Sequence, residues 1–394
     1  MRWMNNGKFP FLINTVISRF RSHATLLGVI LCVGRFCALA YSDEHAPHAA
    51  KILSKPVTVD RVYKSMEGIT GEKGFGLTAE PNQPELLWVT GGRIDMVRAE
   101  DGSNGTEKFL CHAYLKFDDR YFKTLGPQTR EKTINHLGRL FTFVQGQADI
   151  RLPRGFGIPV LSTEPFEMEY MVINPTQPPQ PFQVNTLGVF DYVRDTELKE
   201  PLKPLVMRIV GMHVPVKQGS AGPHAQCSEL GDASMAGGGT VEQDAEPAKV
   251  SLHKIRKNKS GFDEVYHWMV PPGRHEYRYQ LESQVLVNAP FDTTVHYINA
   301  HLHPHGEFLE LRDVTTDNTV FRSVATNNAE RTGLTQLTHF SSEKGIPIYR
   351  NHQYEMVAGY NNTTDHDIDA MAIFFVYLLD QTLNKEQLGT ASAF

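Results

Sequence analysis

Two histidines at alternate positions are the first residues in this sequence whose types and spacing could do chemistry. His301 and His303 follow the segment 295–300, Val-His-Tyr-Ile-Asn-Ala, which is typical of a β-strand. Because alternate residues of a strand share a face, we expect the two imidazoles to lie side by side. Neutral imidazole is the commonest metal ligand among side chains, so the pair predicts half of a transition-metal site. His305, which follows Pro304, is expected at the rim of the sheet as an extra ligand or a supporting group.

A methionine seventy residues further on could complete this site. Met371 lies near the start of an apolar run, 370–379, that is short enough to be a buried strand of a sandwich. Methionine in such a strand is ordinarily core filler, and that interpretation stays open. If the two strands share one sheet system, however, its thioether sulfur is a soft ligand that selects copper, above all Cu(I), over zinc or magnesium. The pattern therefore predicts copper held by His301, His303 and Met371.

The spacing of His301, His303 and Met371, with the turn-like segment 359–364 before the methionine, resembles the copper type II, ascorbate-dependent monooxygenase family. This is the family of peptidylglycine α-hydroxylating monooxygenase and dopamine β-monooxygenase. The resemblance is strong over about residues 262–382 and weaker over about 57–200. It implies two β-sandwich domains with one copper each. It also implies that an activated C–H bond of a small-molecule or peptide substrate is hydroxylated by O2, with ascorbate or another external electron donor.

The first half departs from the family pattern where the resemblance implies two adjacent histidines. The matching strand carries Cys111-His112, and the segment 167–173, which is expected to bring a third histidine, has none. Two interpretations stay open. Either the first domain binds no metal, or Cys111 and His112 form a second, softer site with a sulfur such as that of Met168 or Met171.

Several other side chains are expected to support the copper site. A ligating imidazole usually donates its other N–H to a carboxylate or a carbonyl, and Glu307, Asp369 and Glu310 are candidates for that acceptor. His339, in a loop-like segment before the methionine strand, is a candidate supporting group or extra ligand. His267, beside a tryptophan, is interpreted as a packed histidine rather than a ligand.

The elements that must position these residues are expected to be β-strands. Strand-like segments such as 86–90 and 93–97, separated by two glycines, recur along the chain, and convincing helices are few. Strands at such intervals are typical of sandwiches. The fold class is therefore predicted to be all-β, with two antiparallel, jelly-roll-like β-sandwich domains over 57–215 and 250–382.

The remaining segments are expected to lie outside these domains. Residues 1–40 hold five basic residues, no acidic residue, an apolar run and a terminal Ala-Leu-Ala, which together predict a secretory signal peptide. Residues 41–56 are predicted to be a flexible N-terminal segment, 216–249 a Gly-, Ser- and acid-rich flexible insertion, and 383–394 a C-terminal tail. The mature protein is therefore expected to be secreted or periplasmic, without stable membrane insertion.

Composition narrows the functions further. Without the basic signal segment the net charge is near −10, and no basic patch stands out, which argues against nucleic acid as a partner. Cys111 and Cys227 remain after the signal, and a disulfide between them is left open. Three functions are compatible with the residues. They are an exported copper monooxygenase, a non-catalytic extracytoplasmic copper-binding protein, and a β-sandwich interaction protein without chemistry.

Overall fold

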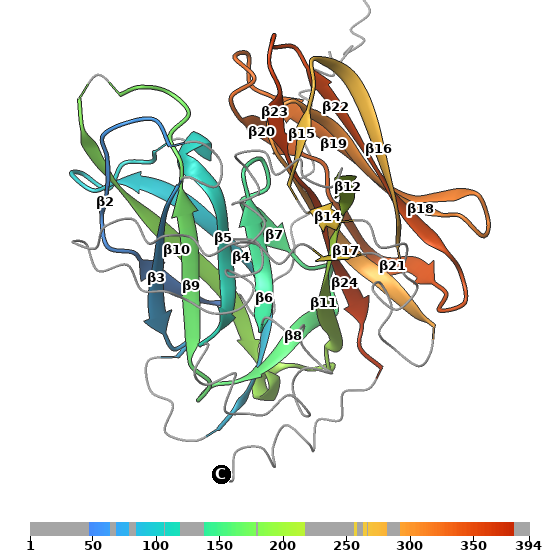
Figure 1. Cartoon of the computed structure of the whole chain (residues 1–394). Helices are drawn as coiled ribbons and strands as arrows, with labels where there is room; N and C mark the ends of the chain where they lie inside the picture. The colour runs from blue at the N-terminus through green and yellow to red at the C-terminus, as the bar shows by residue number, and fades with distance from the viewer. Residues whose placement is uncertain are drawn as a thin grey trace, which may run out of the picture. The chain divides into compact units, whose positions relative to one another are not determined.

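Strands make up almost all of the regular structure (Figure 1). The structure is a computed structural model that describes residues 47–63, 68–78, 84–105, 107–118, 138–178, 180–216, 256–257, 263–265, 267–281 and 292–381. The predicted signal peptide, the predicted tail and the predicted insertion from residue 217 onward lie outside these ranges. In the described ranges, helix is limited to two short 3-10 turns, η1 (Glu107–Phe109) and η2 (Asp195–Glu197). None of the described residues forms a helix with the length and apolar character needed to cross a bilayer. The predicted all-β class is confirmed.

The first group of strands forms one β-sandwich. Its strands are β1 (His48–Leu53), β2 (Val57–Val59), β3 (Ile69–Phe75), β4 (Leu86–Arg98), β5 (Leu110–Phe117), β6 (Arg139–Val144), β7 (Asp149–Arg151), β8 (Phe156–Leu161), β9 (Phe166–Val172) and β10 (Phe182–Arg194). The sheet β3-β9-β5-β6 packs on the part of a 10-stranded sheet that runs β1-β10-β4-β8. Phe190 of β10 marks this interior, since its ring centroid lies 5.4 Å from that of Phe75 and 6.1 Å from that of Phe143. Aromatic side chains of both sheets thus fill the core between them.

The second group of strands forms another sandwich. Its strands are β11 (Lys203–Gly211), β12 (Val214–Val216), β13 (Arg256–Lys257), β14 (Asp263–Val265), β15 (Trp268–Val270), β16 (Gly273–Leu281), β17 (Thr293–Leu302), β18 (Gly306–Asp313), β19 (Asn318–Asn327), β20 (Leu334–Leu337), β21 (Phe340–Ile348), β22 (Tyr354–Asn362), β23 (Ile368–Ala370) and β24 (Ala372–Leu379). The sheet β16-β22-β18-β19-β20 packs on the β11-β24-β17-β21 end of the 10-stranded sheet. Phe321 of β19 and Phe374 of β24, with ring centroids 6.0 Å apart, lie in this second interior.

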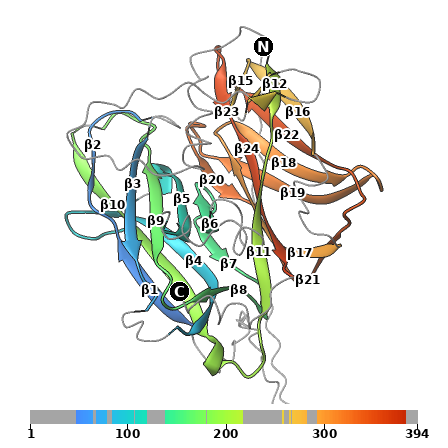
Figure 2. The same cartoon turned by 60° about the horizontal axis from the view of Figure 1, so that its bottom comes forward.

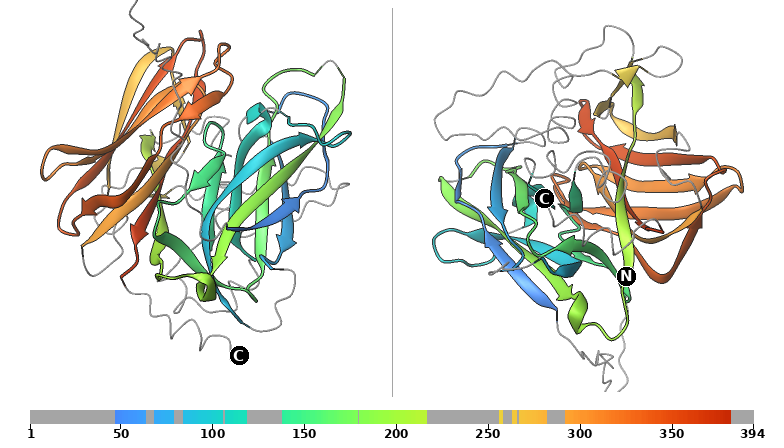
Figure 3. Two further views of the ribbon diagram at one scale, coloured as in Figure 1. Left: turned by 180° about the vertical axis from the view of Figure 1, so that it is seen from behind. Right: turned by 90° about the horizontal axis from the view of Figure 1, so that it is seen from below.

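Strand β11 joins the two groups. It pairs antiparallel with β24 over Leu205–Gly211 and meets β8 in parallel only at Lys203 and Pro204. Figures 2 and 3 show β11 running between the blue-green strands and the orange strands. All described residues belong to one compact unit, His45–Phe394. The domain boundaries at 215 and 250 stay a prediction.

The N-terminal segment predicted to be flexible contains a strand, so the structure differs from the prediction over 48–53. β1 pairs antiparallel with β10 from His48, opposite Tyr192, to Leu53, opposite Leu187. The ring of His48 also stacks on Tyr192 at 5.2 Å. A ladder is built from backbone groups, which a polar segment supplies as readily as an apolar one. Composition alone therefore missed this strand.

The two glycines expected to separate two strands instead lie within a single strand, β4. A Cβ atom on Gly91 would lie 2.6 Å from the carbonyl oxygen of Ile150, and one on Gly92 would lie 2.9 Å from the ring of Phe190. Both positions therefore need glycine for close packing rather than for a chain reversal.

Candidate metal centre

His301 and His303 lie at the end of β17, on the face that points away from the interior of the second sandwich. Ala300 pairs with Phe374, which packs into that interior, so the next residue, His301, points to the opposite side. The ring centroids of His301 and His303 lie 5.3 Å apart at an interplanar angle of 84°. Only 8% of the surface of His301 and 2% of that of His303 is exposed. The two imidazoles thus form a close, buried pair.

Met371 lies between β23 and β24, where one chain segment changes its pairing partner. β23 pairs with β15 up to Ala370, and β24 pairs with β17 from Ala372. Continued by one residue, these two registers bring His267 and His303 opposite Met371. Directly opposite residues of antiparallel strands put their side chains on the same face. Met371 is buried and belongs to the apolar core.

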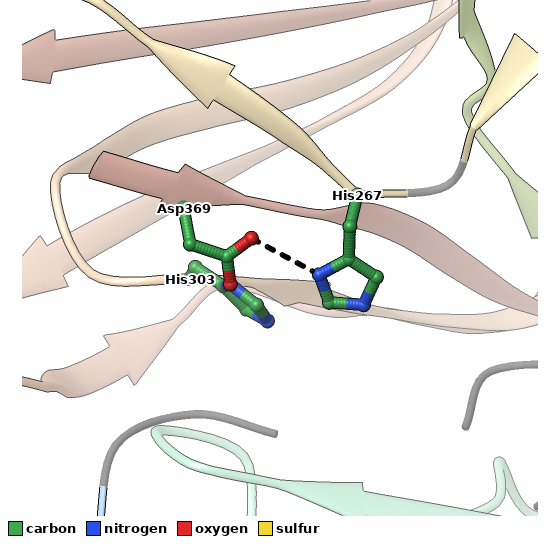
Figure 4. A group of neighbouring side chains, drawn as sticks. All are labelled: His267, His303 and Asp369. Carbon is green, nitrogen blue, oxygen red and sulfur yellow. Dashed lines mark hydrogen bonds and ion pairs between the residues drawn. The ribbon is translucent and has the colours of Figure 1, made fainter. Parts of the chain in front are cut away.

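One carboxylate contacts two imidazoles at this place (Figure 4). Nδ1 of His267 lies 3.2 Å from Oδ1 of Asp369, and Nδ1 of His303 lies 2.8 Å from Oδ2. The ring centroids of His267 and His303 are 5.1 Å apart. The ligand atoms of all three residues lie within 4.8 Å of one another, and both histidines are buried. His267, His303 and Asp369 therefore form a candidate metal-binding group.

The contacts of Asp369 are made by Nδ1 of each ring. A neutral imidazole that donates its Nδ1–H to a carboxylate carries a lone pair on Nε2. Figure 4 shows the second nitrogens of His267 and His303 on the side of the rings away from the carboxylate. A carboxylate behind an imidazole is the usual support of a metal-ligating histidine. Asp369 is one of the three acceptors that the sequence suggested.

The protonation states of the centre favour a cation. Burial would raise the pKa of the Asp369 carboxyl, but the charges of His303 and His267 and their hydrogen bonds outweigh burial and hold this pKa well below its usual range. Burial lowers the pKa of His301 well below the usual value, and the charges of His303 and His112 lower it further. An ionised carboxylate and a neutral imidazole are the forms that metal binding requires.

The spacing of the rings fits ligands of one common ion. An imidazole bound at about 2.0–2.1 Å has its centroid about 3.2 Å from the metal, so two rings at a tetrahedral angle have centroids roughly 5 Å apart. The His267–His303 and His301–His303 centroid distances are 5.1 and 5.3 Å. Both distances agree with the spacing of two rings bound to one ion.

Tyr360 of β22 links the two strand ends that carry the donors. Its hydroxyl donates to the backbone oxygen of Met371 at 2.6 Å. The same hydroxyl oxygen accepts the backbone N–H groups of His303 and Met371, each at 3.3 Å. Burial raises the pKa of Tyr360, so the hydroxyl keeps its proton. One phenol therefore fixes the backbone positions of both donor residues.

His112, from the predicted second site, lies near the same centre. It belongs to β5, where its ring stacks on Tyr114 with centroids 4.8 Å apart. Burial lowers the pKa of His112 to about 3, and the charges of Arg139, His303 and His267 contribute to this shift. His112 thus interacts electrostatically with histidines of the second half, and it lies outside the His267–His303–Asp369 group.

Cys111 has different surroundings. It is buried in a small apolar cluster with Met171 and Ile173. It lies at a bulge of β5, between Leu110 and His112 in the pairing with β9. Cys227, with which a disulfide was left open, lies outside the described residues.

The two candidate supporting histidines lie outside the His267–His303–Asp369 group. His305 occupies the turn after β17 with φ of 70°, and its Nδ1 lies 3.3 Å from the backbone oxygen of Asn361. The ring of His339 stacks on Tyr297 with centroids 5.4 Å apart, four residues along β17 from His301. A strand advances about 3.3 Å per residue, so His339 lies more than about 10 Å along the strand from the paired histidines.

His267 is the donor that its local sequence does not reveal. Its partner Asp369 lies 102 residues further along the chain, and the pairing of β15 with β23 brings the two together. The sequence pattern that could have indicated a partner for Asp369 lies at β23, the strand that pairs with β15. Asp369 and Met371 alternate there, which puts two metal-competent side chains on one face and indicates that a further donor could lie across from them.

Comparison with known proteins assigns no family. No family model matches the chain, and no curated protein matches it significantly. Among solved structures, PNGase F, a glycosylasparaginase from Flavobacterium meningosepticum, is similar with a TM-score of 0.32 and 9% identity, over 85% of this chain and 96% of that one. The PBCV-1 virus capsid gives a TM-score of 0.28 and 7% identity, over 84% of this chain and 94% of that one. The STIV MCP gives 0.23 and 8%, over 83% and 97%. Such low TM-scores indicate nothing about the chemistry of this chain.

Proposed function

We propose that this chain is an exported copper protein with monooxygenase-like activity, whose ligands are His267, His301, His303 and Met371. The observation that carries the proposal is the meeting of His267 and His303 on the two oxygens of Asp369, with His301 beside His303. When bound, copper supplies one-electron chemistry towards O2 and an external donor such as ascorbate. The substrate is a small molecule or a peptide with an activated C–H bond.

The chain's own residues prepare this chemistry in three ways. Asp369 holds two imidazoles by Nδ1 and so aims their Nε2 atoms to the same side. Burial keeps His301 neutral, so that a proton does not compete with the metal. Tyr360 fixes the backbone of His303 and Met371, which limits the separation of imidazole and thioether.

A second candidate is a site for a borderline ion such as zinc, with Asp369 as a direct ligand. The proximity of its carboxylate oxygens to both Nδ1 atoms favours this alternative, because His and Asp together form many zinc sites. In that case Met371 is core filler and the site has no redox role. A third outcome is copper binding by the proposed ligands without turnover, as in a copper buffer.

Metal loading of the purified mature protein decides among these functions. The protein is incubated separately with Cu(I) and Zn²⁺, dialysed against a weak chelator and analysed for metal content. X-ray absorption of the copper form and ascorbate-dependent O2 consumption follow. We expect one copper per chain, a sulfur ligand, and O2 consumption that the His303→Ala variant lacks. Preferential zinc retention without a sulfur ligand supports the second candidate, and copper without O2 consumption supports a buffer. No retained metal supports the interaction protein.

A further inference from the structure

The turn between β17 and β18 carries the proposed ligand His303. The ladder of β17 with β24 ends at Leu302, and β18 begins at Gly306. The backbone N–H of Gly306 donates to the backbone oxygen of His303 at 3.2 Å. A Cβ atom on Gly306 would lie 3.1 Å from that oxygen, so the turn is tight. The backbone of His303 therefore depends on the contacts that hold this turn, in addition to its bond with Tyr360.

His305 gives the turn an unusual conformation. Its φ of 70° lies in the left-handed region, which residues other than glycine adopt uncommonly. Such conformations persist where the surroundings hold them in place. On the side of β22, the backbone oxygen of His305 accepts the N–H of Asn361 at 2.9 Å. On the side of β19, its backbone N–H donates to Oδ1 of Asn327 at 2.7 Å. Both neighbouring strands thus hold this residue.

Asn327, the last residue of β19, makes two hydrogen bonds to the turn with one side-chain amide. Oδ1 accepts the N–H of His305, and Nδ2 donates to the backbone oxygen of Gly306 at 2.8 Å. The backbone ladder between β18 and β19 reaches only to Phe308, opposite Val324. An asparagine amide has the same kinds of donor and acceptor as a peptide unit. Asn327 therefore extends the bonding of β19 beyond the end of this ladder and onto the turn.

The next residue shows the same chemistry in a purely local role. Oδ1 of Asn328 accepts the N–H of Thr332 at 2.9 Å, and its Nδ2 donates to Oγ1 of Thr332 at 3.1 Å. Asn328 thus closes its own loop, four residues long. Asn327 instead binds residues 21 and 22 positions earlier in the chain, next to a proposed ligand.

We propose that Asn327 is a positioning residue for His303. The inference rests on the proposed function, because it takes His303 as a metal ligand. Asn327 holds His305 and Gly306, and the bond from Gly306 to His303 passes this constraint to the end of β17. There Nδ1 of His303 lies 2.8 Å from Asp369, a contact that orients the imidazole. Without the amide, His305 is free to leave the left-handed region, and the ring of His303 loses its fixed direction.

The test compares copper binding by the full mature protein and by three variants. Asn327→Ala removes both hydrogen bonds to the turn. Asn327→Asp keeps an acceptor for the N–H of His305 and loses the donor to Gly306. Asn328→Ala is the matched control, because it removes an equivalent amide from the neighbouring loop. Chelator competition measures copper affinity, urea unfolding measures stability, and electron paramagnetic resonance of the Cu(II) form reports ligand geometry, which a change in overall stability alone does not alter.

We expect Asn327→Ala to lose about tenfold or more in copper affinity and to change the Cu(II) spectrum, with a smaller loss in Asn327→Asp. Asn328→Ala should keep the wild-type affinity and spectrum, even where its stability falls.

A folded Asn327→Ala protein with wild-type affinity and spectrum overturns the inference, as do equal losses in Asn327→Ala and Asn328→Ala. If Asn327→Ala does not fold, Asn327→Asp decides alone, and wild-type values for both measurements overturn the inference. These outcomes leave the copper function standing. If the wild-type protein retains no copper, the proposed function fails and the inference fails with it.

Discussion

Two histidine–aspartate contacts in the second sandwich have similar distances and different surroundings. Nδ1 of His303 lies 2.8 Å from Asp369, and Nδ1 of His352 lies 2.6 Å from Oδ2 of Asp313. Both carboxylates are largely covered by protein. A pairwise distance therefore does not distinguish the two contacts.

The second oxygen of each carboxylate does distinguish them. Oδ1 of Asp313 accepts the backbone N–H groups of Thr315 and Thr316, at 3.0 and 3.3 Å, and so closes the turn after β18. Oδ1 of Asp369 instead contacts a second imidazole, that of His267, at 3.2 Å. One carboxylate organises a turn, and the other brings together side chains from strands far apart in sequence.

This difference shows when a histidine–aspartate contact becomes a candidate metal centre. Several neutral donor side chains must lie close together. The carboxylate must contact these side chains rather than accept hydrogen bonds from backbone N–H groups. The imidazoles of His267 and His303 meet on Asp369, with His301 beside His303, whereas the ring of His352 packs on Tyr349 with centroids 4.6 Å apart.

The largest expected effect separates His303 from His352. His303→Ala removes a ligand, so copper affinity should fall by more than the roughly 10–100-fold that loss of a supporting partner causes. His352→Ala should keep the wild-type affinity, because its ring serves a turn. Copper content after dialysis against a graded series of chelators measures both. Equal losses in the two variants would remove the distinction between the contacts.

Exchange of the carboxylates should give the next largest effect. Asp369→Asn leaves one imidazole facing an amide N–H₂ group instead of an acceptor, and copper affinity is expected to fall about 10–100-fold. Asp313→Asn should leave copper affinity unchanged. Competition titration with a Cu(I) chelator gives the ratio directly. A wild-type affinity in a folded Asp369→Asn protein would show that the carboxylate plays no part in binding.

Met371→Ile tests whether the thioether belongs with the donors or with the core. The volumes are similar, so the free energy of unfolding should change by less than about 1.5 kcal/mol. Cu(I) affinity should nevertheless fall sharply, and Cu(II) affinity should fall less, because thioether prefers the softer ion. Chelator competition and urea unfolding are measured on the same preparation. If Cu(I) affinity and O2 consumption are both unchanged, Met371 is core filler.

The smallest expected effect concerns the pH dependence of stability at Asp313. Burial raises the pKa of this carboxyl, but hydrogen bonds from His352 and Thr316 outweigh burial and leave the pKa below its usual value. A carboxyl with a lowered pKa stabilises the fold above its unfolded pKa of about 3.9, and this contribution is lost as pH falls through the folded pKa. Asp313→Asn should therefore lower the free energy of unfolding by about 1–2 kcal/mol at neutral pH, and by less below pH about 4. Urea unfolding at both pH values checks this, and a difference that grows on acidification would contradict it.

Local patterns predicted the fold class and part of the candidate centre. Alternation along a strand is visible in a few consecutive residues, so the all-β class and the shared face of His301 and His303 could be predicted. The approach of His267 to Asp369 could not, because it depends on which strands pair and in what register, over 102 residues. The strand over 48–53 escaped prediction for a related reason, since its stability comes from the ladder with β10.

The prediction for His112 shows a second way in which local sequence patterns mislead. Its sequence neighbour Cys111 suggested a site of their own, because adjacent residues are easily grouped when only the chain order is known. In the fold, Cys111 joins Met171 in an apolar cluster, whereas the ring of His112 stacks on Tyr114. At this bulge of β5, Cys111 and His112 are adjacent in sequence but have different neighbours in space.

The phenol of Tyr360 acts as a rigid spacer between two strand ends. The ladder of β17 with β24 ends at Leu302 and Ala372, and beyond this pair the hydroxyl of Tyr360 takes over the bonding of His303 and Met371. The backbone positions of His303 and Met371 are therefore fixed before any ion binds. Ordering the backbone of one residue costs about 1–2 kcal/mol of conformational free energy. Because these residues are already ordered, metal binding does not have to offset that cost. The metal ion would then bind and dissociate without local unfolding of these strands, at rates that depend on its access to the site.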